Sequence, residues 1–89
     1  MFYVYVLKGS SNPKYYIGFT TDLKKRFSEH NAGENISTRR GKPWVLLYFE
    51  AYDKEVYARN RERMLKQRGK AWQELKKRVG EIVLKKVLG

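Results

Sequence analysis

Two short runs of aromatic and β-branched residues at the start of the chain restrict its fold more than any other feature. Residues 2–8 read FYVYVLK, and residues 15–19 (YYIGF) repeat the pattern after the turn-forming segment 9–13 (GSSNP). Such residues favour strands, and two runs joined by a few turn residues are typical of a hairpin. The sequence therefore predicts a β-hairpin over residues 2–19.

A helix is predicted directly after the hairpin, over about residues 21–31. The segment 20–22 (TTD) supplies side-chain oxygens that cap helix N-termini, Leu23 and Phe27 lie one turn apart, and Gly33 offers a C-terminal cap. The next stretch, residues 32–43, has no periodicity and is long for a connection within a compact domain. We therefore expect a functional or mobile loop there.

The second half of the chain predicts one more strand and then helices. The strand is Trp44–Tyr52, and its uninterrupted apolar run suggests burial on both faces. Helical propensity follows over Lys54–Lys66, and again after Gly69 as one or two short helices split at Gly80. The resulting order is β-β-α-β-α plus a C-terminal helical tail. This is an α+β fold, a small three-stranded antiparallel sheet flanked by helices.

Length and composition limit what such a chain can be. With 89 residues we expect one domain, residues 1–80, with residues 81–89 as a helical tail packed on it or extending it. No cysteine is present and there is one histidine, so disulfides, thiol nucleophiles and zinc sites built from cysteine or several histidines are excluded. A bound metal must rely on carboxylates and water, which suits Mg²⁺ or Mn²⁺. The longest apolar run, Met1–Leu7, is too short to span a membrane and has no basic leader, so we expect a cytoplasmic protein.

The charge of the chain points to a polyanionic partner. Lys and Arg number 20 against 9 Asp and Glu, a net charge of +11, and residues 59–86 hold eleven Lys or Arg against three Glu. A solvated, solubilising surface is the alternative, but ordinary soluble domains mix the two signs more evenly. We therefore expect nucleic-acid binding. The candidate contacts are Lys24, Lys25, Thr38, Arg39, Arg40, Lys42, Arg61 and Lys66.

Several polar side chains are spaced so that the predicted elements bring them together. Strand alternation places Tyr5 on one face of the sheet, where Tyr16 of the second strand joins it if the register permits. Arg26 and His30 are one turn apart on the first helix, and a guanidinium there suits a phosphate. The alternatives are half-buried sheet tyrosines and a capping or surface histidine.

These residues belong to a longer pattern. Tyr16-Ile17-Gly18 continues to Arg26, and the later segments 29–31 (EHN), 37–39 (STR) and 61–66 (RERMLK) follow in order. Together they resemble the GIY-YIG nuclease domain, in the stand-alone form of small bacterial proteins, over about residues 2–80. The first motif reads Tyr3-Val4-Tyr5 here, with tyrosine where the family name has glycine, while the functional final tyrosine is present.

The resemblance implies a metal-dependent endonuclease that hydrolyses DNA phosphodiester bonds in DNA repair or processing. It would be directed by DNA structure rather than by DNA sequence. The resemblance implies Tyr5 as the group that activates water, Arg26 as the phosphate stabiliser and Glu62 as the only protein ligand of Mg²⁺ or Mn²⁺. Tyr16 and His30 would orient substrate or relay protons. For Glu62 the alternative is a helical ion pair with Lys66.

The expected partner is DNA, with RNA as a second candidate; no membrane partner is expected and no protein partner is identifiable. The competing function is a non-catalytic, basic nucleic-acid-binding module on the same fold.

Overall fold

The computed structural model describes residues 1–9, 14–34, 38 and 43–88, and for residues 80–88 only the course of the backbone. The described elements are the strands β1 (Phe2–Gly9), β2 (Tyr15–Thr20) and β3 (Trp44–Tyr52) and the helices α1 (Leu23–Ala32), α2 (Glu55–Lys66) and α3 (Lys70–Leu88). The predicted α+β fold and its element order are confirmed. Most of the predicted loop between α1 and β3 lies outside the described residues.

The sheet is antiparallel, with the strand order β2-β1-β3. β1 is therefore the central strand, and its residues Val4–Leu7 are all buried. β3 is an edge strand on which Val45 and Phe49 are each 50% exposed. The prediction that β3 is buried on both faces is therefore wrong, because an apolar run does not reveal which strand pairs on two sides.

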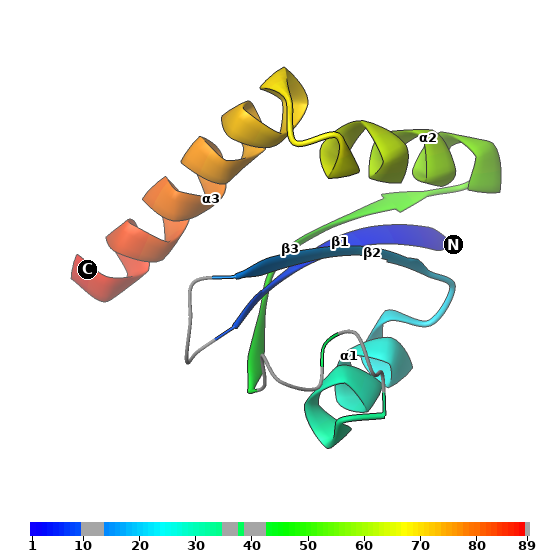
Figure 1. Cartoon of the computed structure of the whole chain (residues 1–89), viewed down its shortest axis with the longest axis horizontal. Coiled ribbons are helices and arrows are strands. Elements are labelled where there is room, and N and C mark those ends of the chain that lie inside the picture. Colours follow the sequence, from blue (N-terminus) through cyan, green and yellow to red (C-terminus); the bar gives the residue numbers. More distant parts are fainter. Residues whose placement is uncertain (10–13, 35–37, 39–42, 89) are drawn as a thin grey trace.

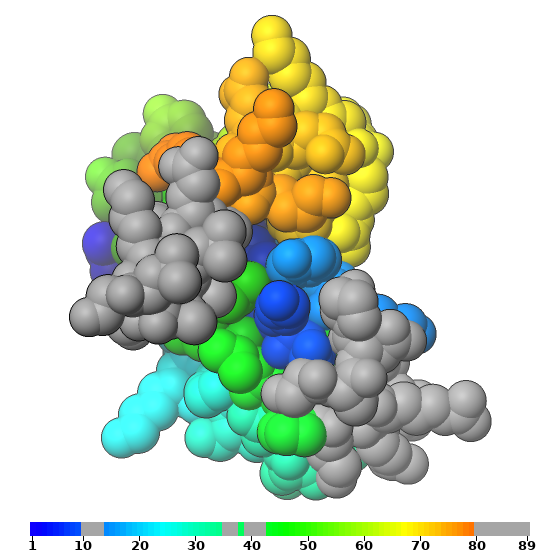
Figure 2. All heavy atoms as spheres, turned by 90° about the vertical axis from the view of Figure 1, so that its left-hand side faces the viewer, coloured from blue at the N-terminus to red at the C-terminus, as the bar shows by residue number. Residues whose placement is uncertain are grey.

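Helices cover the two faces of the sheet unequally. Figure 1 shows α1 on one face and both α2 and α3 on the other. The space-filling view in Figure 2 shows the same division from the side, with α3 (orange) above the strands (blue and green) and α1 (cyan) below them. The sheet therefore has two separate packing surfaces.

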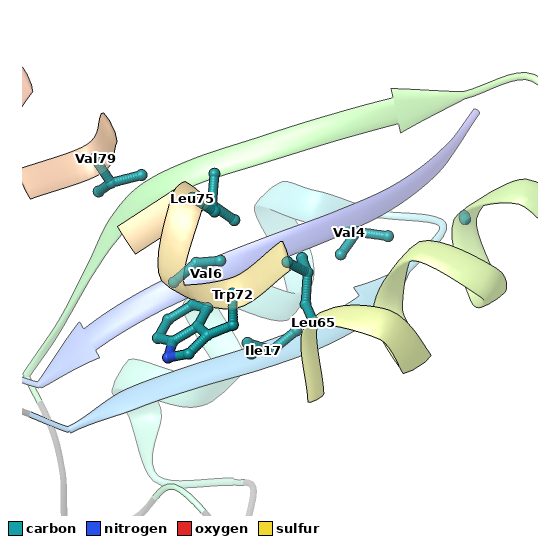
Figure 3. Packing of buried hydrophobic residues seen from close by; sticks show 8 residues of the cluster. Val4, Val6, Ile17, Leu65, Trp72, Leu75 and Val79 are labelled. Atoms are coloured by element: carbon teal, nitrogen blue, oxygen red, sulfur yellow. The ribbon is translucent and has the colours of Figure 1, made fainter. Parts of the chain in front are cut away.

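The α2/α3 face is built from aliphatic side chains. Val4 and Val6 of β1 and Ile17 of β2 lie against α2 and α3 (Figure 3). The helices contribute Leu65 and Trp72, and further along α3 Leu75 and Val79 complete the buried cluster. Full burial of one such side chain stabilises the fold by roughly 1.5–3 kcal/mol.

Local sequence signals position α1. Asp22 caps its N-terminus, where one carboxylate oxygen accepts a hydrogen bond from the Lys25 N–H at 3.1 Å. At the other end Gly33 has φ 77°, a left-handed conformation that glycine adopts without steric cost. Both predicted caps are confirmed, and they fix the rotation and length of the helix.

α3 differs from its prediction. Its backbone stays helical from Lys70 through Gly80 to Leu88, so the expected interruption at Gly80 is absent. A single glycine costs a helix interior only about 1 kcal/mol relative to alanine, which the surrounding helix formers outweigh. No helix in the described part of the chain is long and apolar enough to cross a membrane.

Candidate active site

A buried chain of hydrogen bonds crosses the α1 face of the sheet. The Tyr5 hydroxyl on β1 lies 2.8 Å from His30 Nε2 on α1, and His30 Nδ1 lies 2.7 Å from Thr38 Oγ1. The three residues are 1%, 0% and 1% exposed, respectively. The arrangement leaves both imidazole nitrogens satisfied, so the ring is fixed in position and in orientation.

Burial keeps both His30 and Tyr5 uncharged. Burial, followed by the positive charge of Arg26, lowers the pKa of His30 below its usual value of 6.5. Burial also raises the pKa of Tyr5 well above 10, and Tyr16 adds to this effect. The Arg26 guanidinium opposes the rise, by its charge and by hydrogen bonding, while the Glu62 carboxylate reinforces it. The site at rest therefore holds a neutral phenol beside a neutral imidazole.

Gly18 makes room for the Tyr5 ring. The two residues face each other across β1 and β2, and a Cβ atom on Gly18 would lie 2.4 Å from both Cζ and Oη of Tyr5. No ordinary contact is that short, so the phenol lies across the backbone of β2 only because position 18 lacks a side chain. The glycine of the Tyr-Ile-Gly motif therefore sets the direction of the Tyr5 hydroxyl.

Tyr16 packs against the same histidine from β2. Its ring meets the His30 ring edge-on at 4.9 Å between centroids and lies 6.2 Å from the Tyr5 ring. The expected shared face for the two tyrosines is therefore present. Tyr16 is half-buried, so its ring closes one side of the cluster while part of it meets solvent.

Arg26 lies at the margin of the cluster, one turn before His30. Its guanidinium pairs with Glu29 at 3.3 Å, and 39% of its side chain is exposed. Because it also acts on the pKa of both Tyr5 and His30, it is close to the hydroxyl and still accessible from outside. A planar guanidinium in this position suits two oxygens of a phosphate.

Glu62 lies on α2, and its charge acts on Tyr5. Its carboxylate pairs with Lys66 at 2.8 Å and with Arg59 at 3.5 Å, and only 13% of the side chain is exposed. The helical ion pair with Lys66 is thus present. No cluster of three or more potential metal ligands occurs among the described residues. The donor chemistry fits a hard cation held by this one carboxylate, water and a ligand phosphate, and it does not fit zinc.

Two residues outside the predicted set hold the cluster together. The Asn31 side chain accepts a hydrogen bond from the Trp44 N–H and donates one to the Trp44 carbonyl, which fastens α1 to the start of β3. The Trp44 indole N–H donates to the Thr38 carbonyl at 2.7 Å. The sequence analysis predicted neither contact. The available signal was an asparagine near the C-terminus of the first predicted helix, together with a tryptophan at the start of the next predicted strand.

The expected nucleic-acid contacts separate into four groups. Lys24 and Lys25 are exposed on α1. Thr38 is buried against His30 instead of facing solvent, because its hydroxyl forms a hydrogen bond with His30 Nδ1. Arg61 and Lys66 are engaged in ion pairs with Glu50 and Glu62. Arg39, Arg40 and Lys42 lie outside the described residues.

The Glu50 partner of Arg61 was not predicted. Glu50 on β3 accepts hydrogen bonds from the hydroxyls of Tyr48 and Tyr52, and from Arg61 on α2 at 3.1–3.2 Å. Burial raises its pKa, but these bonds outweigh burial and hold the pKa below its usual value. The alternating spacing of Tyr48, Glu50 and Tyr52 was the available signal, because it places all three on one face of a strand.

A match to a known family identifies this α+β fold as a domain of nuclease fold. The chain matches the GIY-YIG catalytic domain over residues 1–78, and it therefore belongs to that family. It is 40% identical over 75 residues to a UPF0213 protein of Halobacterium salinarum, an alignment that covers 83% of this chain and 96% of the relative.

Other relatives carry the same name. A UPF0213 protein of Streptococcus pyogenes is 43% identical over 67 residues, covering 74% of this chain and 72% of the relative. One of Haloquadratum walsbyi is 42% identical over 65 residues, covering 72% of each chain. No solved structure matches. The relatives thus come from both bacteria and archaea.

Proposed function

We propose that this chain is a metal-dependent endonuclease that hydrolyses phosphodiester bonds in DNA and responds to DNA structure rather than to sequence. The observation that carries the proposal is the buried Tyr5–His30 hydrogen bond beside a half-accessible Arg26, in a domain of nuclease fold. Cleavage of a phosphodiester needs a group that takes a proton from water and a positive charge where negative charge develops. Tyr5 and Arg26 supply these two properties.

Tyr5 requires help from its surroundings to accept a proton from water. A phenol with a raised pKa is a very weak acid, so its phenolate is scarce at neutral pH. With Nδ1–H donated to Thr38, the free lone pair of His30 Nε2 accepts the Tyr5 hydroxyl proton across 2.8 Å. Arg26 favours the resulting phenolate by its charge. His30 and Arg26, one turn apart on α1, therefore both act on Tyr5.

Mg²⁺ or Mn²⁺ is the cofactor in this proposal. Glu62 is the residue that would hold it, with water and a phosphate oxygen of the substrate as the other ligands. When bound, the cation offsets negative charge at the phosphate and at the Tyr5 oxygen. Lys66 and Arg59, which pair with Glu62 in the protein alone, would then be released towards the phosphates.

The substrate class follows from the charges around the site. The exposed cations Lys24 and Lys25 lie on α1, the helix that also carries Arg26 and His30. Lysines contact the phosphates of the backbone, which fixes the register of a strand and carries no base sequence. This supports recognition of DNA shape. Branched, nicked and single-stranded DNA are the forms to compare.

The test is cleavage of that DNA panel with Mg²⁺ and with Mn²⁺, by wild type and by Glu62→Gln. We expect the substitution to lower cleavage by orders of magnitude while DNA binding is kept, since a neutral amide is a poor ligand for a hard cation. Glu55→Gln is the matched control, because Glu55 pairs with the same Arg59 but is exposed. Wild-type turnover in Glu62→Gln would remove Glu62 from the metal site.

A second function, a nucleic-acid-binding module without turnover, is favoured by the ion pairs of Glu62. Its carboxylate pairs with both Arg59 and Lys66 in the protein alone, and these two cations compete with a metal ion for it. In that case the DNA panel would be bound in a salt-dependent manner but not cut with either metal. Tyr5→Phe would then bind DNA as wild type does and change no other property of the complex.

A further inference from the structure

A groove lies beside the tyrosine–histidine cluster on the same face of the sheet. Its walls are mostly apolar, its rim carries Lys24, and its volume is about 560 Å³. The residues that form its apolar surface are Tyr3, Leu23, Phe27, Leu46 and Phe49. The groove thus lies between the N-terminal half of α1 and the strands β1 and β3.

Two aromatic rings form its floor. Phe49 is 50% exposed although it lies opposite the buried Tyr5 across β1 and β3. The Tyr3 ring meets the Phe49 ring edge-on at 6.1 Å. Tyr3 stands where the first family motif has glycine, so the motif does not account for this part of the groove floor.

The position of Tyr5 leaves the groove open. Its ring lies across Gly18, and so extends from β1 towards β2 and away from Phe49. Tyr3 is two residues from Tyr5 on the same strand face, so their Cα atoms are about 7 Å apart. Because the Tyr5 hydroxyl extends away from the groove, the path from it to the groove is longer than this, more than two stacked nucleotides at ~3.4 Å each. A strand with one phosphate at Tyr5 and Arg26 therefore brings a nearby base to the groove.

We propose that this groove binds an unstacked nucleobase of the strand that occupies the candidate active site. The proposal rests on the proposed function and names its substrate class: single-stranded DNA, or a strand with an unpaired base. Apolar and aromatic walls match the faces of a base, and the exposed amines of Lys24 and Lys25 match the phosphates on either side of it. The Asp22 carboxylate at the rim is engaged by the Lys25 N–H as the helix cap.

The experiment measures binding of a fluorescently labelled oligothymidine about a dozen nucleotides long, within the footprint of ~4–16 nucleotides that single-strand modules cover. A second strand of equal length and charge carries abasic sugars in place of the bases. We expect Phe49→Ala to weaken binding of oligothymidine by about 5- to 100-fold, the usual loss per stacked base, and to leave the abasic strand unchanged. Phe49→Trp, which keeps an aromatic face, should restore binding.

Tyr57→Ala is the matched control, since Tyr57 is an aromatic residue on α2 with a similar exposure of 55% and lies outside the groove. It should bind both strands as wild type does. Circular dichroism verifies that each variant is folded, which we expect because Phe49 is half-exposed.

Equal losses of Phe49→Ala on the two strands, or no loss on either, would overturn the proposal. A changed sedimentation coefficient for Phe49→Ala with unchanged DNA binding would also overturn it, since a second copy of the chain would then occupy the groove. Wild type that binds and cuts DNA without preferring bases over abasic sugars refutes the groove alone. Wild type that binds no DNA refutes the proposed function as well.

Discussion

The two faces of one small sheet are packed differently, although each has an apolar cluster. On the α2/α3 face, Val4, Val6 and Ile17 meet aliphatic and aromatic side chains of the two helices. On the α1 face, Tyr5 meets His30 and the helix is held by hydrogen bonds. Because strand residues alternate between faces, β1 supplies both, with even-numbered residues on one side and odd-numbered residues on the other.

The difference shows that one small sheet carries its larger apolar cluster on one face and its buried tyrosine–histidine contacts on the other. Apolar contacts on the α2/α3 face need no particular orientation, and burial of area stabilises them. Polar groups on the α1 face cost free energy unless each finds a partner. Within the described residues, every buried side-chain nitrogen and oxygen has one. The α1 face is therefore specific in geometry, while the α2/α3 face supports the fold.

The largest effect is expected from Leu65→Ala, which affects only the α2/α3 face. Leu65 is fully buried, and such a truncation costs about 2–5 kcal/mol of unfolding free energy. Urea denaturation measures the loss, and Met64→Ala, next to it and 43% exposed, is the control with a small change. Cleavage per folded molecule should equal that of wild type. A folded Leu65→Ala variant without activity would mean that packing on this face also positions the site, with Glu62 on the same helix as the route.

The complementary substitution on the α1 face is Tyr5→Phe. Loss of one preorganised polar group commonly lowers a rate by ~10²–10³, or ~3–4 kcal/mol, and we expect at least this for DNA cleavage. Stability should fall less, by about 1–3 kcal/mol, because His30 Nε2 loses its partner. The measurements are cleavage rate and urea denaturation, with the exposed Tyr57→Phe as control. Unchanged cleavage would remove Tyr5 from the chemistry.

The sequence was sufficient for the local features of the fold. The hairpin, the caps of α1 and the element order depend on short-range preferences that residues such as Asp22 and Gly33 express directly. The central place of β1 was not predictable in this way, because it depends on pairing between distant strands. The apolar run of β3 therefore gave a wrong expectation of burial.

In the candidate site, too, the sequence predicted the short-range features but not the contacts between distant segments. The spacing of Tyr5, Tyr16, Arg26 and His30 indicated one shared region, and the rings of Tyr5, Tyr16 and His30 do meet. The full burial of His30 was not predictable, since it depends on Thr38 approaching from a segment without periodicity. The ion pair of Arg61 was not predictable either, because its partner Glu50 lies eleven residues away on another element.

Arg61→Gln tests the polar cluster of Glu50, Tyr48, Tyr52 and Arg61, which joins β3 to α2. The guanidinium and the Glu50 carboxylate are 25% and 17% exposed, and we expect a loss of about 1–3 kcal/mol on removing the charge, since Glu50 stays largely buried. Thermal and urea denaturation measure it, with the exposed Arg63→Gln as control. DNA affinity should be retained. A loss of DNA affinity with full stability would instead return Arg61 to the nucleic-acid contacts predicted from sequence.

The smallest expected effect is a pH dependence confined to the α1 face. The chain has one histidine, and burial followed by Arg26 lowers the pKa of His30 in the folded protein. The unfolded chain therefore takes up a proton near its usual pKa of 6.5 while the folded chain does not. Consequently the free energy of unfolding falls as the pH drops below about 6.5, by at most ~1.4 kcal/mol per pH unit, and the loss levels off below the folded pKa.

The measurement is urea denaturation between about pH 7.5 and 5, above the range in which carboxylates such as Glu50 titrate. Nuclear magnetic resonance of the single imidazole gives the folded pKa directly. Cleavage should decline over the same interval, because a protonated His30 no longer accepts the Tyr5 hydroxyl proton. Leu65→Ala should shift the whole stability profile downward without changing its shape, since the aliphatic cluster carries no titrating group. A free energy of unfolding that instead rises as the pH falls from 7.5, with a His30 pKa above its usual value, would mean that the folded protein holds a charged imidazole. The Tyr5–His30 bond would then run in the opposite direction, from imidazolium to phenol oxygen.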